Sequence, residues 1–293
     1  MQSPFTFFFN TVSTGRMAAV IAGLLMLSFQ VPQTFAHSLY IQSTQYFADE
    51  DKSLPLYFCY GHYVPVADGL RGKKLNRVNV VSPDGTATPI TVRDEKSLHS
   101  YMVNYNATGT WTLTAETTPG YYTVYTDKKG KERHTIKPMA KIMDRAKEVH
   151  KSYFAKQYAK TYVNCERPSA TFPARAGLAL ELVPRTDLFT LKPGDNLELD
   201  VYLDGKPYTG KGTWDGTYMG FSTVAEDNFY PKTEVEGSRI SVALPDTGRW
   251  FIRYFIKKDA PEADKDKYLQ MKLTATLTFQ IDNERKTPEP EGH

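Results

Sequence analysis

Short stretches of alternating polar and apolar residues, each closed by a turn sequence, recur along most of the chain. Residues 75–81 (LNRVNVV) end at Ser82-Pro-Asp-Gly85, and residues 197–203 (LELDVYL) end at Asp204-Gly205. Short strands with turn signals about every 8–12 residues are typical of antiparallel sandwiches. The pattern therefore predicts an all-β protein, because such strands bury one face each and must pair with another sheet.

Two groups of these strands are separated by one segment of different character. The first group lies in residues 37–137 and the second in residues 169–283, which predicts two β-sandwich domains. Residues 140–163 contain no Gly or Pro, and their apolar side chains recur at helical spacing. We therefore expect one α-helix, within residues 138–168, to join the domains. The charged, Pro-containing residues 284–293 are expected to form a disordered tail.

The start of the chain has the pattern of a secretory signal. An apolar run from Ala18 to Phe29 is followed by small residues at Thr34 and Ala36, the form that a signal peptidase accepts. The run is too short to span a bilayer comfortably, and no second one follows. We expect residues 1–36 to be removed, which gives a periplasmic chain that starts at His37. The alternative is an uncleaved anchor.

The formal net charge is +3, which is close to balance. Such a net charge indicates no basic field for nucleic acid and no polybasic anchor for a membrane surface, so we expect no nucleic-acid partner. Because no second apolar run follows the first, we also expect no membrane span after cleavage. The predicted helix does carry basic residues on one face, which suits either an anionic partner or, more simply, solvent. These residues are Lys141, Arg145, Lys147, Lys151 and Lys156.

The two cysteines, Cys59 and Cys165, form an even pair in a chain with an export signal. In an oxidising compartment an even pair favours a disulfide, which we predict here. The alternative is two unrelated buried thiols.

Two histidines stand out as candidate metal ligands. Cleavage after Ala36 gives His37 a free α-amine beside its imidazole, and the two groups can chelate one metal ion. His62 follows Gly61, where the backbone is free to turn the ring into a site. If the strand that starts at His37 pairs antiparallel with the strand that ends at Gly61, the two rings lie close together. Imidazole and amine nitrogens suit nickel, cobalt, copper and zinc.

Other features of the sequence limit this interpretation. Water or a carboxylate such as Asp94 or Glu95 can complete the coordination. The alternative to metal binding is that His37 belongs to a frayed terminus and His62 to a surface loop. The sequence contains no phosphate loop, no Gly-x-Ser-x-Gly, no His-Glu-x-x-His and no Cys-x-x-Cys. We therefore expect a protein that is not an enzyme.

Several short motifs follow one another in a fixed order over nearly the whole mature chain. They are Ala36-His37, Tyr60-Gly61-His62, Ser82-Pro-Asp-Gly85, Pro119-Gly-Tyr-Tyr122, Tyr158-Ala-Lys160, Leu180-Glu-Leu-Val-Pro184, Leu191-Lys-Pro-Gly-Asp195, Asp204-Gly-Lys-Pro207 and Thr247-Gly-Arg-Trp250. In these motifs the chain resembles a periplasmic family of unknown function that is often labelled as nickel or cobalt uptake-complex subunits. The resemblance implies immunoglobulin- or transthyretin-like sandwiches, with His37 and His62 at the family's early histidines.

The leading hypothesis is a periplasmic accessory protein that binds nickel or cobalt and passes it to a membrane transporter. A second hypothesis is a structural or adhesive sandwich that binds a protein or glycan through its loops. A third is a copper monooxygenase, because an N-terminal His and a second His can form a copper brace. Metal binding by the mature protein separates the first hypothesis from the second.

Overall fold

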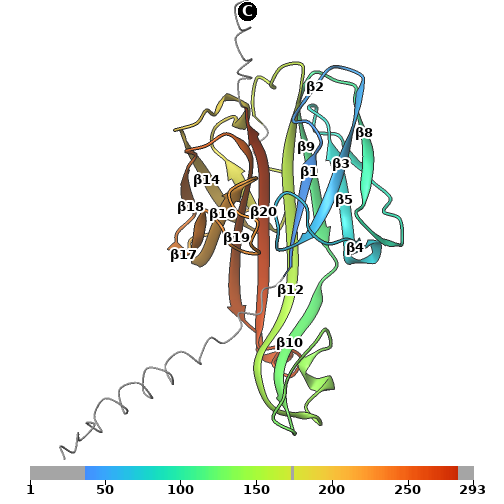
Figure 1. Cartoon of the computed structure of the whole chain (residues 1–293), viewed down its shortest axis with the longest axis vertical. Helices are drawn as coiled ribbons and strands as arrows, with labels where there is room; N and C mark the ends of the chain where they lie inside the picture. The colour runs from blue at the N-terminus through green and yellow to red at the C-terminus, as the bar shows by residue number, and fades with distance from the viewer. Residues whose placement is uncertain (1–36, 173–174, 283–293) are drawn as a thin grey trace, which may run out of the picture. The chain divides into compact units, whose positions relative to one another are not determined.

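The computed structural model describes residues 37–172 and 175–282, which form β-strands and four short 3-10 turns (Figure 1). Within these ranges there is no α-helix. The predicted signal sequence, its cleavage point and the predicted tail fall on residues outside them, and these expectations stay predictions. The 3-10 turns are η1 (Gly72–Lys74), η2 (Met139–Lys141), η3 (Leu188–Thr190) and η4 (Glu262–Asp264).

One large sheet runs through the described chain, and its strands come from both halves of the sequence. In order across the sheet they are β17 (Tyr230–Glu236), β16 (Lys211–Tyr218), β19 (Gly248–Asp259), β20 (Gln270–Ile281), β12 (Ala146–Cys165), β9 (Gly109–Thr117), β5 (Leu75–Val81) and β6 (Ala87–Pro89). Three further strands pair off this path, namely β2 (Phe47–Ala48), β10 (Gly120–Asp127) and β11 (Glu132–Thr135).

Two smaller sheets pack on opposite faces of the large one. The first contains β1 (Ser38–Ser43), β3 (Lys52–Gly61) and β8 (Ser100–Tyr105), and the second contains β13 (Leu180–Pro184), β14 (Asn196–Leu203), β15 (Lys206–Pro207) and β18 (Arg239–Ala243). Two short strands, β4 (Leu70–Arg71) and β7 (Lys96–Ser97), form a separate two-stranded sheet. The two sandwiches predicted from the sequence are therefore present, and they share a sheet.

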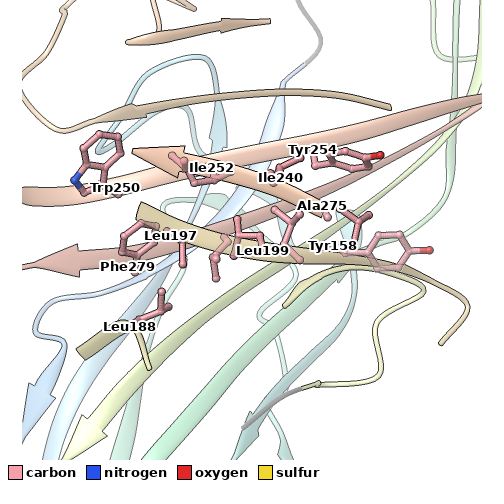
Figure 2. Packing of buried hydrophobic residues seen from close by; sticks show 14 of the residues in the cluster. Tyr158, Leu188, Leu197, Leu199, Ile240, Trp250, Ile252, Tyr254, Ala275 and Phe279 are labelled. Carbon is pink, nitrogen blue, oxygen red and sulfur yellow. The ribbon is translucent and has the colours of Figure 1, made fainter. Parts of the chain in front are cut away.

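Strand β12 explains both this sharing and the error in the predicted helix. Its Ala159 and Val163 belong to the first core, whereas Tyr158 and Tyr162 belong to the second. Figure 2 shows Tyr158 in this second core together with residues such as Leu199. Side chains alternate across a strand, so consecutive residues of β12 serve two cores. A strand buried on both faces shows no polar–apolar alternation, and such a run cannot be told from a helix by periodicity.

The predicted disulfide between Cys59 and Cys165 is wrong, because both thiols are free and buried. Phe58 faces the first core, so its neighbour Cys59 points to the other side of β3, against Tyr40. Cys165 lies inside the first core. Burial raises the pKa of the Cys59 thiol to about 11 and also raises that of Cys165, which makes both thiols poor nucleophiles.

Candidate metal centre

The side chains of His37 and His62 lie against each other. Strands β1 and β3 are antiparallel, with Ser38 opposite Gly61, so the residue before β1 meets the residue after β3. The centroids of the two imidazole rings are 4.5 Å apart. The expected proximity of the two histidines is therefore confirmed, whereas metal binding by them stays a prediction.

The backbone next to His37 is held by side chains of the large sheet. Strand β1 is an edge strand of its sheet, and side chains of the large sheet take the place of a neighbouring strand. The Gln157 side chain donates to the His37 carbonyl (2.8 Å) and accepts from the Leu39 amide (2.7 Å). Thr276 Oγ1 donates to the Leu39 carbonyl at 2.7 Å. These contacts hold the backbone of His37, whose nitrogen would become the α-amine if the predicted cleavage at Ala36 takes place.

Each histidine ring donates a hydrogen bond to a carboxylate. His37 Nε2 donates to Asp68 (3.3 Å), and the His37 ring also stacks on Tyr60 with centroids 5.2 Å apart. His62 Nδ1 donates to Glu226 Oε1 at 3.1 Å, and the Glu226 amide donates to the His62 carbonyl at 3.2 Å. Carboxylates accept only, so these contacts fix the tautomers. The lone pairs that can bind a metal are then on His37 Nδ1 and His62 Nε2.

A buried arginine of β19 holds Glu226 in place. Arg253 donates to both oxygens of Glu226, at 2.9 and 2.7 Å, and its Nε donates to Asp215 at 2.9 Å. It also reaches the Ser38 hydroxyl, 2.8 Å away, next to His37. Burial raises the pKa of the Glu226 carboxyl, but Arg253 and the His62 hydrogen bond outweigh burial and hold the pKa at about 2. Glu226 is therefore an anion at every physiological pH.

Replacement of Glu226 by Gln is expected to lower the free energy of unfolding at neutral pH by about 3 kcal/mol. The folded carboxyl titrates near 2 and the unfolded one near 4.5, so this stabilisation is complete above pH 4.5 and is lost as the pH falls towards 2. Urea unfolding of the wild type and of Glu226→Gln across that range measures the difference. Parallel curves for the two proteins between pH 5 and pH 2 would contradict the assignment.

The carboxylates suggested from the sequence, Asp94 and Glu95, are not the ones bonded to the two rings, which are Asp68 and Glu226. Glu95 accepts from Arg93 at 2.9 Å and from Ser97 at 3.1 Å, an arrangement that ties it to its own loop. The ring of His99 is buried and bonded to Tyr101 and to backbone carbonyls. A pocket of about 700 Å³ is lined by Phe47, Phe189 and their neighbours, and none of the histidines lines it.

The side chains alone do not make a complete metal centre. In residues 37–172 and 175–282 no group of three His, Cys, Asp or Glu side chains is arranged to hold a metal ion. The two rings supply two nitrogen ligands. The predicted cleavage at Ala36 would create a third nitrogen, the α-amine of His37, which could form a six-membered chelate with Nδ1 of the same residue. The set of three nitrogen donors is therefore complete only if the chain is processed there.

These observations define an all-β protein in which two sandwiches share one sheet and a histidine pair lies where β1 and β3 meet that sheet. The chain belongs to a family described as a domain of unknown function (DUF4198), whose model matches residues 34–258. Among curated proteins, none is similar enough in sequence to match. No helix in the described part of the chain is long and apolar enough to cross a membrane.

Solved structures show only remote similarity. Escherichia coli alpha-2-macroglobulin activated by porcine elastase is 11% identical, with 83% of this chain and 20% of that chain covered and a TM-score of 0.24. This chain thus spans about a fifth of that protein. The tandem V-type regions of a v-region-containing chitin binding protein are 9% identical over 82% and 99% of the two chains (TM-score 0.19). Murine CEACAM1b is 10% identical over 84% and 99% (TM-score 0.17).

Proposed function

We propose that the processed protein is a periplasmic, non-enzymatic accessory protein that binds one nickel or cobalt ion and passes it to a membrane transporter. The observation that carries the proposal is the contact between the His37 and His62 rings, 4.5 Å apart, with a carboxylate behind each ring. A carboxylate that accepts from the second nitrogen of a ligating imidazole is the usual arrangement around metal-binding histidines.

The donor set indicates which ions bind. Two imidazoles and one amine are nitrogen donors of intermediate softness, which suit Ni²⁺, Co²⁺, Cu²⁺ and Zn²⁺ far better than Mg²⁺ or Ca²⁺. The choice of nickel or cobalt as cargo, the periplasmic location and the transporter partner rest on the family resemblance of the motifs. The coordination positions that the three protein nitrogens leave open would be filled by water or other exchangeable ligands. Such ligands can be replaced when the ion is passed on, as delivery requires.

The first test is calorimetric titration of Ni²⁺ into protein purified from the periplasm and processed at Ala36. His62→Ala is expected to weaken binding at least about tenfold, because it removes one of three nitrogen donors. His150→Ala is the matched control, since its ring bonds to Thr126 and lies on a different strand. Affinity is expected to fall steeply below about pH 6, because protons compete for imidazole and amine nitrogens.

Two results would contradict the proposal. One is a processed wild type that binds none of these metals, which favours the adhesive-module hypothesis. The other is an equal loss of affinity in His62→Ala and His150→Ala, which indicates nonspecific surface binding. Unfolding midpoints measured without metal establish that each variant is folded.

A further inference from the structure

The sheet continues beyond both cores as an arm, defined here as residues 120–155. It contains β10, β11 and the first half of β12, and β10 pairs with β12 from Gly120 to Asp127 (Figure 1). Neither of the two large cores contains an apolar residue of the arm. Strand β12 has 20 residues, whereas strands of five or six are usual. The arm therefore contributes to neither large core, nor to the histidine pair.

The arm concentrates the positive charge of the molecule. Residues 126–151 hold nine Lys and Arg against four Asp and Glu, a net charge of +5 in a chain whose total is +3. The rest of the sequence is therefore slightly negative, at −2. The near-balanced total hides this basic segment, so the expectation from net charge that the chain has no polybasic anchor does not hold for the arm. All nine basic side chains are exposed. They are Lys128, Lys129, Lys131, Arg133, Lys137, Lys141, Arg145, Lys147 and Lys151.

Exposed apolar side chains accompany these charges. Ile136 is 80% exposed and Met143 is 54% exposed, and both lie between basic residues in the sequence. Exposure of a large apolar side chain to water is unfavourable, and the arm exposes two of them. Basic residues mixed with exposed apolar ones are typical of segments that lie in the headgroup region of a bilayer.

We propose that this arm docks the protein on an anionic phospholipid surface. Seven of its nine cations are lysines, and lysine is depleted in protein–protein interfaces but effective against a diffuse layer of lipid phosphates. The charges also come from two strands, β11 and β12, and from the turns before each of them, which suits a layer of lipid better than one flat protein epitope. The proposal is independent of the metal site and fails or holds separately from it.

The test is co-sedimentation of the processed protein with vesicles of phosphatidylglycerol and phosphatidylcholine, and with vesicles of phosphatidylcholine alone. Binding is expected only to the anionic vesicles and is expected to weaken as salt is added. Each lysine near an anionic surface strengthens binding roughly fivefold. A variant with Lys128, Lys129, Lys131 and Lys141 all changed to Gln is therefore expected to bind more than about 100-fold more weakly. Ile136→Ser is expected to bind about tenfold more weakly, because it removes an apolar side chain that enters the headgroup region.

A charge-matched control changes four exposed lysines outside the arm to Gln, namely Lys52, Lys192, Lys206 and Lys211. It is expected to keep most of the binding. Absence of binding to anionic vesicles at low salt overturns the proposal, and so does equal binding by the arm variant and the control. Capture of an acidic protein without vesicle binding also overturns it, and assigns the arm to a protein partner.

Discussion

One alanine added before His37 is expected to lower the affinity of the protein for Ni²⁺ by about 100-fold or more. The addition converts the α-amine of His37 into an amide, which does not donate a lone pair at neutral pH. It also destroys the chelate between the amine and Nδ1, so that two independent imidazoles remain. A 100-fold loss corresponds to about 2.7 kcal/mol of binding free energy, and it occurs although every side chain is unchanged.

The measurement is calorimetry of the processed protein and of the extended one at the same pH. An alanine added after His293 is the matched control, because it changes the length equally at the other terminus. Unfolding midpoints without metal are expected to agree among the three proteins. Undiminished affinity of the extended protein would show that the amine is not a ligand, and would leave the two rings as the whole site.

The proximity of the two histidines could be predicted because it depends on local rules. Antiparallel pairing of the strand after His37 with the strand before His62 follows from their order, their lengths and the turn between them. No long-range information was needed. Local rules gave no such guide to the carboxylates: the sequence suggests Asp94 or Glu95, whereas Glu226 is the residue that contacts His62.

Glu226 was missed because its contact with His62 joins residues 164 positions apart, across two sandwiches. One signal in the sequence did point to it. Arg253 interrupts the apolar run of residues 250–255, and an arginine at such a position needs a buried acidic partner. That signal predicts an acidic partner, but it does not say which carboxylate supplies it. In the structure, Arg253 forms ion pairs with both Asp215 and Glu226.

The error over residues 140–163 has a different cause. In β12, Lys160 and Thr161 are both buried, so polar residues stand at core positions and the alternation is hidden. The repeated tyrosines, valine and threonine of its second half are strand formers, and they were the better guide to the structure. The sharing of one sheet by two sandwiches thus removed from this strand the polar–apolar alternation that would have identified it.

Removal of the Glu181 carboxylate is expected to have a large effect on stability. Lys160 and Glu181 are each 2% exposed, and their charged groups are 2.6 Å apart. Burial lowers the pKa of Lys160, but Tyr162 and Glu181 outweigh burial and raise it, so the ammonium group stays charged inside the molecule. In Glu181→Ala this charge loses its partner, and the free energy of unfolding is expected to fall by about 3–5 kcal/mol.

Urea unfolding at neutral pH measures this loss, and a double variant distinguishes its cause. Lys160→Met combined with Glu181→Leu removes both charges and fills the space with apolar atoms, so it is expected to recover most of the lost stability. The backbone amides of Ala176 and Gly177, which donate to Glu181, lose their acceptor in both variants. A loss of less than about 1 kcal/mol in Glu181→Ala would indicate a solvated pair. If instead the double variant is as unstable as Glu181→Ala, the stabilisation comes from those two amides, and the contact of β12 with the second sandwich does not depend on its buried lysine.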